Sequence, residues 1–78
     1  DGEFLYASER LVVSPGSGVF TPLETTTTGQ LISAGDLIGH VGTTEVRTAF
    51  AGTLHGILAV NGERVASSQP IAWLRVSA

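Results

Sequence analysis

The 78-residue sequence contains no cysteine, and its four basic residues are all arginines, so it contains no lysine either. Without cysteine no disulfide can hold the fold, and two histidines are too few for a structural zinc site. A chain of this size buries only about 60% of the surface that it exposes when unfolded. Aromatic residues make up only 6% of the sequence. We therefore expect one domain, stabilised by an aliphatic core under a closed or well-covered sheet.

Charged residues are also few, at 14% of the sequence, and the formal net charge is −3. The arginines are isolated and form no basic stripe, so we expect no nucleic-acid partner. No apolar run approaches the ~18 residues of a membrane span, so we expect no direct insertion into a membrane. The lack of cysteine leaves the compartment open, and we favour the cytoplasm. The chain begins at Asp1, and we expect it to be a piece of a longer protein or a processed product.

Glycine interrupts the sequence every few residues, and short runs of β-branched and aliphatic residues lie between the glycines. No window keeps the apolar spacing of a helix without a glycine or proline, which favours an all-β sandwich or barrel. Asn61-Gly62 predicts a tight turn, and Pro22 predicts an edge strand or a bulge. Threonine suits a pleated surface, so we interpret Thr25 to Thr28 as an exposed edge strand. We expect Trp73 to cover one end of the small core.

Three pairs of short segments recur at a nearly constant offset along the chain. They are Gly18-Val19 with Gly52-Thr53, Gly29-Gln30 with Gly62-Glu63, and Leu37-Ile38 with Pro70-Ile71. This spacing predicts an internal repeat of two four-strand units that close on each other about a pseudo-two-fold axis. The alternative is coincidence, because glycine is frequent throughout the chain.

Four segments, in this order, resemble the biotinyl/lipoyl (biotin/lipoyl attachment-like) domain family. Ser14 to Val19 (SPGSGV) is similar to its opening Pro-x-x-Gly-x-Val, Gly29 to Ile38 to its first turn and strand, Thr44 to Gly52 (TEVRTAFAG) to the strand after its tip, and Asn61 to Ile71 to the second copy of the turn. The resemblance covers Leu11 to Val76. It implies an all-β barrel-sandwich hybrid, a flattened β-barrel of two pseudo-two-fold related four-strand halves. The domain would occupy residues 11–78, and residues 1–10 would be an N-terminal extension or an extra strand.

The sequence departs from this family at the tip. The family carries its modified lysine in Glu-Ala-Met-Lys-Met or Asp-Lys-Ala, just after the strand that corresponds to Leu37–Val41. Here the chain runs from Val41 directly to Val46, about four residues shorter, and an even deletion preserves the inward and outward alternation of both flanking strands. Gly42-Thr43 could close this hairpin as a type II′ turn. Because no lysine amine is present, the resemblance implies that neither biotin nor lipoate is attached, and we expect no cofactor.

The first functional hypothesis is a non-catalytic structural or protein-interaction domain of a larger protein. Its candidate contact is the shortened hairpin of Val41, Gly42, Thr43, Thr44 and Glu45. A protein partner or a neighbouring domain is expected, and the oligomeric state is left open. The domain by itself is not expected to be an enzyme, although the parent protein could belong to a biotin- or lipoate-dependent system.

Two other functions are alternatives to this hypothesis. The first is the lipoyl-like domain of a membrane-fusion adaptor of efflux or secretion systems, which also lacks a modified lysine. Such adaptors usually insert a helical hairpin between the two halves, and Val41 to Val46 leaves no room for one. A few adaptors have short insertions, so this alternative stays open. The second is a phosphocarrier or metal site at His40 and His55, which fall in different halves on strands that could be neighbours. Both histidines would have to face each other, with further ligands or acids beside them.

Overall fold

The computed structural model describes residues 9–76, and this range contains eight strands and no helix. The strands are β1 (Glu9–Val13), β2 (Gly18–Pro22), β3 (Leu31–Ile32), β4 (Leu37–Val41), β5 (Thr44–Arg47), β6 (Gly52–Ile57), β7 (Arg64–Val65) and β8 (Pro70–Arg75). A search of the same residues finds no helix with the length and apolarity needed to cross a membrane.

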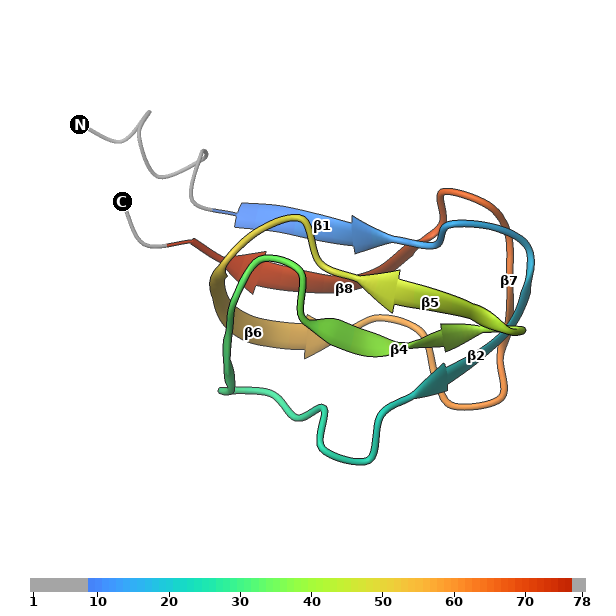
Figure 1. Cartoon of the computed structure of the whole chain (residues 1–78), viewed down its shortest axis with the longest axis horizontal. Helices are drawn as coiled ribbons and strands as arrows, with labels where there is room; N and C mark the ends of the chain where they lie inside the picture. Colours follow the sequence, from blue (N-terminus) through green and yellow to red (C-terminus); the bar gives the residue numbers. More distant parts are fainter. Residues whose placement is uncertain (1–8, 77–78) are drawn as a thin grey trace.

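The strands form two antiparallel sheets of four strands each, in the orders β1-β8-β6-β3 and β5-β4-β2-β7 (Figure 1). Each order becomes the other when every strand is exchanged with the strand four places away, β1 with β5, β2 with β6, β3 with β7 and β4 with β8. The predicted all-β barrel-sandwich fold, a flattened β-barrel of two pseudo-two-fold related halves, is confirmed. Figure 1 shows the β4–β5 hairpin at the right end, opposite the end where β1 begins and β8 ends.

The core lies between the two sheets and is aliphatic except for Phe20, as the composition predicts. It contains Val12, Phe20, Ile32, Ile38, Val41, Val46, Leu54, Ala59, Val65, Ile71, Ala72 and Leu74, each at most 6% exposed. Both sheets contribute because alternate residues of a strand face the same side. Complete burial of each larger side chain stabilises the fold by about 1.5–3 kcal/mol relative to exposure.

One turn geometry recurs in both halves. Four four-residue turns form two equivalent pairs with the same offset in the sequence. The pairs are Thr27–Gln30 with Val60–Glu63 and Ser33–Asp36 with Ala66–Gln69. In each turn the fourth N–H donates to the first carbonyl, at 3.3, 3.0, 3.0 and 3.1 Å in that order. A side-chain oxygen of the fourth residue accepts from the first N–H, at 3.1, 2.9, 2.9 and 2.9 Å. The third residue has a positive φ, as a type II turn requires. The two halves therefore use the same capped turn at equivalent positions.

Two buried hydroxyl residues, Ser14 and Thr48, occupy equivalent positions in the two halves. Each donates its hydroxyl to the carbonyl two residues ahead, and its backbone N–H and carbonyl bind the turn that precedes the neighbouring strand. The bonds are Ser14 Oγ to Gly16 O (2.5 Å), Ser14 N to Gln69 O (2.8 Å) and Ser68 N to Ser14 O (2.9 Å), against Thr48 Oγ1 to Phe50 O (2.8 Å), Thr48 N to Asp36 O (3.1 Å) and Gly35 N to Thr48 O (2.7 Å). Each residue therefore fixes the end of one strand against the turn that leads into the neighbouring strand of the same sheet.

The edge strand predicted at Thr25 to Thr28 is wrong. These residues belong to the connection between β2 and β3, where Thr26 N donates to Leu23 O at 3.0 Å to close one turn. Thr27 opens the next turn, and the Thr26 hydroxyl donates to Ile38 O at 2.9 Å. Thr26 and Thr27 therefore find hydrogen-bond partners in and near successive turns, without joining a sheet.

Pro22 and Asn61-Gly62 show how pairing partners decide the role of a residue. Pro22 ends β2, which is an inner strand, so the predicted edge or bulge is wrong. Phe20 N donates to Glu63 O, and by alternation the N of Pro22 points to the same side, beyond the end of β7. The missing N–H of proline therefore costs no ladder bond.

Asn61-Gly62 does form a tight turn, but it joins β6 and β7 of different sheets.

The predicted domain boundary between residues 10 and 11 falls inside β1, which begins at Glu9. The remainder of the predicted extension or extra strand, residues 1–8, lies outside the described residues, as do residues 77–78.

Candidate functional site: the β4–β5 hairpin

The hairpin that joins β4 and β5 closes in two residues. Val41 pairs with Thr44, and only Gly42 and Thr43 lie between them. Gly42 has a φ of 60°, and Ser68 is the only non-glycine residue with a positive φ in the described part of the chain. A positive φ at the first central position alone is the signature of the type II′ turn. The two-residue hairpin predicted from the sequence is confirmed.

The tip of the hairpin is held against the sheet. Gly42 N donates to Val19 O of β2 at 2.9 Å, and the Val41 side chain is buried in the core with 3% exposure. Of the five residues predicted for the candidate contact, Val41 therefore belongs to the core. Gly42, Thr43, Thr44 and Glu45 are exposed. The exposed tip is short and is tied to β2 through Gly42.

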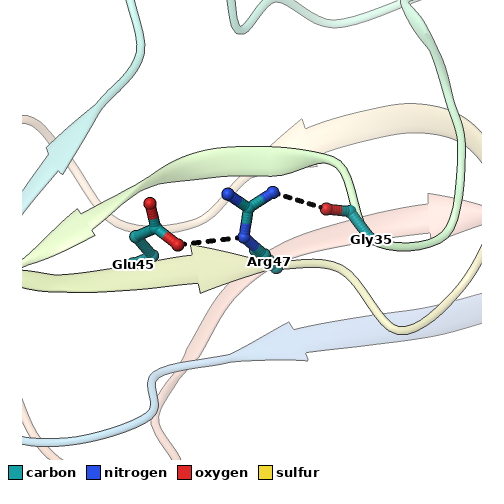
Figure 2. Close-up of polar contacts among 3 residues, drawn as sticks. All are labelled: Gly35, Glu45 and Arg47. Carbon is teal, nitrogen blue, oxygen red and sulfur yellow. Dashed lines mark hydrogen bonds and ion pairs between the residues drawn. The ribbon is translucent and has the colours of Figure 1, made fainter.

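Polar contacts fix the base of the hairpin on the side of β5. Arg47 Nε donates to Glu45 Oε1 at 3.0 Å, and Arg47 Nη1 donates to Gly35 O in the turn before β4 at 2.8 Å (Figure 2). The Glu45 and Arg47 side chains are about half exposed, so water weakens their ion pair to a contribution of about 0–1 kcal/mol. The bond to Gly35 joins β5 to the far end of β4.

The chemistry available at this tip is hydrogen bonding. It presents backbone amide and carbonyl groups, the hydroxyls of Thr43 and Thr44, and the carboxylate of Glu45. The sequence has no lysine, so the tip has no amine that could form an amide with the carboxyl group of a cofactor. Hydroxyl and backbone groups hydrogen-bond to a partner without reacting with it.

The structure does not bring His40 and His55 together. His40 lies on β4 between Thr21 and Glu45, whereas His55 lies on β6 in the other sheet. The expectation that their strands could be neighbours is therefore wrong, because β4 pairs only with β2 and β5. Within residues 9–76 no group of three His, Cys, Asp or Glu side chains could hold a metal ion.

Trp73 lies on the outer face of its sheet, so the expectation that it covers one end of the core is wrong. Its neighbours Ala72 and Leu74 are fully buried, and alternation along β8 turns Trp73 to the opposite side. The Trp73 ring lies 5.0 Å from the His55 ring, at an interplanar angle of 39°. A Cβ on Gly56 would overlap the Trp73 indole, so glycine is required beneath it. No local signal in the sequence places Trp73 on this face, because Ile71, which alternation would put on the same side as Trp73, is itself buried in the core.

Trp73 also lines a shallow groove together with Glu9, Arg10 and Leu11. Leu11 is 50% exposed and Val13 is 45% exposed on the same strand. This outer face is a second candidate surface, and sequence reasoning assigned it no role.

A comparison with known proteins finds a structural likeness but no family. No model of a protein family matches the chain, and no curated protein matches it. Among solved structures, the urea carboxylase of Kluyveromyces lactis is similar to this chain, with a TM-score of 0.69 and 25% sequence identity. The likeness covers 85% of this chain and 6% of that chain, so this chain corresponds to a small part of a much longer protein.

Proposed function

We propose that the chain is a biotinyl/lipoyl-like domain without cofactor attachment, acting as a non-catalytic structural or protein-interaction domain of a larger protein. The observation that carries this proposal is the β4–β5 hairpin, which closes in two residues where the family carries its modified lysine. The fold is kept while the group that performs the chemistry is missing. A domain of this kind can still be recognised by its shape.

The likeness to a urea carboxylase supports this proposal, because carboxylases are enzymes in which biotinyl domains are expected. The likeness spans 85% of this chain and only 6% of the carboxylase. A similar arrangement, with one small domain inside a long chain, is the context that we propose here. The parent protein would then belong to a biotin- or lipoate-dependent system.

The anchored tip supports a role in protein contact. A carrier presents a flexible covalent arm, whereas Gly42 here is tied to β2 and Arg47 is tied to the turn before β4. A rigid surface loses little conformational entropy when a partner binds, which favours recognition. Thr43 and Thr44 are the exposed hydroxyl side chains at its end. No observation favours the two alternative functions: a two-residue turn occupies the place of an inserted helical hairpin, and His40 and His55 lie in different sheets.

The proposal is tested by photo-crosslinking from the tip of the domain in its parent protein. A photoreactive benzoylphenylalanine replaces Thr43, and the matched control carries it at Ala34, which is exposed in the turn before β4 at the other end of that strand. Crosslinks from position 43 to one defined partner or neighbouring domain, without the same product from position 34, support the contact. Equal labelling from both positions, or none from position 43, contradicts it.

The missing cofactor is tested separately by intact mass. The purified chain is incubated with a biotin protein ligase, biotin and ATP, and in parallel with a lipoate ligase, lipoate and ATP. We expect no mass increase in either case, because the sequence offers no lysine amine. A covalent adduct on an internal residue would contradict the proposed loss of attachment.

A further inference from the structure

β5 is an edge strand with a free side. It is the first strand in the order β5-β4-β2-β7, so within residues 9–76 only its β4 side is paired. Thr48, just past its end, directs both backbone groups to that paired side, since its N–H donates to Asp36 O and its carbonyl accepts from Gly35 N. Backbone direction alternates along a strand, so the N–H and C=O groups of Glu45 and Arg47 point to the free side.

The side chains of the same two residues carry opposite charges on the outer face of the sheet. Val46 between them is buried with 1% exposure, which turns Glu45 and Arg47 outward, and both are about half exposed. The strand therefore presents unpaired backbone groups at its edge and one acidic and one basic side chain, two residues apart.

We propose that β5 pairs with β5 of a second copy of this chain, antiparallel and about a two-fold axis at Val46. In this register Glu45 of each copy lies opposite Arg47 of the other. Both of these pairs exchange N–H and C=O bonds, so every backbone group that points to the free side is satisfied. Each pair also places a carboxylate across from a guanidinium, which stabilises neighbouring strands. The two sheets become one continuous sheet through the pair of β5 strands.

Charge and backbone pairing select the same register. A shift by two residues places Glu45 opposite Glu45, or Arg47 opposite Arg47, and like charges directly opposite each other destabilise a strand pair. A shift by one residue places outward-pointing backbone groups opposite inward-pointing ones. Charged residues on an edge usually prevent strand addition, but this pattern is complementary to itself in one register.

The other sheet has a competing edge at β1. Leu11 and Val13 are exposed there, but two apolar side chains specify no register. Both ends of β5, in contrast, are fixed by described contacts, the hairpin at one end and the bonds of Thr48 at the other. The pairing of β5 shares Glu45 with the candidate contact of the proposed function, but it requires no property of Gly42 or Thr43, so the two proposals can fail separately.

Charge reversal tests the proposal in the 78-residue chain. The chain mass is 8.1 kDa, so sedimentation velocity should show a species of twice this mass as the concentration rises toward about 1 mM. Glu45→Arg and Arg47→Glu each place like charges opposite each other twice. We expect the dimer association constant of each variant to fall at least roughly tenfold. An equimolar mixture of the two variants should dimerise again, because one strand is then positive and the other negative. High salt should weaken the wild-type dimer.

A matched control is Leu11→Glu on the edge of β1, which should leave dimerisation unchanged. Far-ultraviolet circular dichroism verifies that every variant keeps its fold. A wild-type chain that stays monomeric over the whole range overturns the proposal, and so does a dimer that survives both reversals or an equimolar mixture that is not rescued. Loss of the dimer in Leu11→Glu alone would move the interface to β1 and overturn the pairing of β5.

Discussion

The backbone of Ser68 adopts the left-handed conformation that Gly35 adopts at the same position of the equivalent turn in the first half. Their φ angles are 69° and 92°. In both turns the fourth residue caps the first N–H, Asp36 in one case and Gln69 in the other. The turn therefore imposes one backbone conformation on two residues that differ in their tolerance of it.

We predict that Ser68→Gly stabilises the domain. A non-glycine residue in the left-handed region is disfavoured by roughly 1–2 kcal/mol, and glycine removes this strain but enlarges the conformational entropy of the unfolded chain. The expected net gain is about 0.5–1 kcal/mol, which raises the melting temperature by about 2–8 °C in a domain of this size. Thermal and urea denaturation measure the change. The reciprocal variant Gly35→Ser should destabilise by a similar amount, and a neutral result for both would contradict the equivalence of the turns.

The buried hydroxyl of Thr48 leads to the second prediction. It donates to Phe50 O at 2.8 Å and accepts from Phe50 N at 3.0 Å, and Thr48 is only 2% exposed. Thr48→Val has nearly the same shape but leaves both Phe50 groups without their partner, so we expect a loss of about 1–3 kcal/mol in the free energy of unfolding. Urea denaturation measures it. Thr48→Ser keeps the hydroxyl and should lose less than the valine variant; the reverse order would show that packing of the methyl group dominates.

The features predicted correctly from the sequence are those that adjacent residues determine. Gly42-Thr43 closes a two-residue hairpin because glycine adopts the positive φ of the first turn position, and this loop length keeps the alternation of Val41 and Val46. The aliphatic core follows from the composition and from the same alternation. Such features depend on a few consecutive residues and on side-chain direction, and both are visible in a sequence.

The predictions that failed depend on which strands pair. Thr25 to Thr28 have a high β-propensity, but two consecutive turns provide their hydrogen bonds, so propensity does not decide their structure. His40 and His55 lie in different sheets because β4 pairs with β2 and β5, whereas β6 pairs with β3 and β8. Trp73 lies beside His55 at a bulge between Leu54 and Gly56, and no local sequence pattern predicts this bulge. Pairing is a property of the whole chain.

The contact between Trp73 and Gly56 gives the third prediction. Gly56→Ala would place a Cβ into the indole, which must then leave its position beside His55. We expect a loss of about 1–3 kcal/mol in stability and a more exposed tryptophan, since the displaced ring loses its packing. Trp73 is the only tryptophan, so its emission should shift to longer wavelength and become easier to quench. The matched control is Gly16→Ala, where a Cβ meets no atom within 4 Å. Unchanged emission in Gly56→Ala would contradict the packing.

The fourth prediction restores the tip of a carrier. Replacing Gly42-Thr43 by a six-residue tip containing Ala-Met-Lys-Met adds an even number of residues, so Val41 and Val46 keep their places in the core. We expect the fold to be retained, because the lengthened hairpin stays exposed and each doubling of a loop costs only about 0.6 kcal/mol. Circular dichroism and thermal denaturation check this part. A biotin ligase should then add biotin to the new lysine, which intact mass detects.

The control for this chimera carries Ala-Met-Arg-Met and should fold equally well without becoming modified. A chimera that folds but is not biotinylated would show that recognition by the ligase needs surface residues beyond the tip, which this chain has lost. A chimera that unfolds, together with its arginine control, would contradict the alignment of Val41 and Thr44 with the ends of the carrier tip. Unfolding would show that the core contacts of Val41 and Val46 depend on the two-residue turn itself. The hairpin could then no longer be regarded as a shortened attachment site.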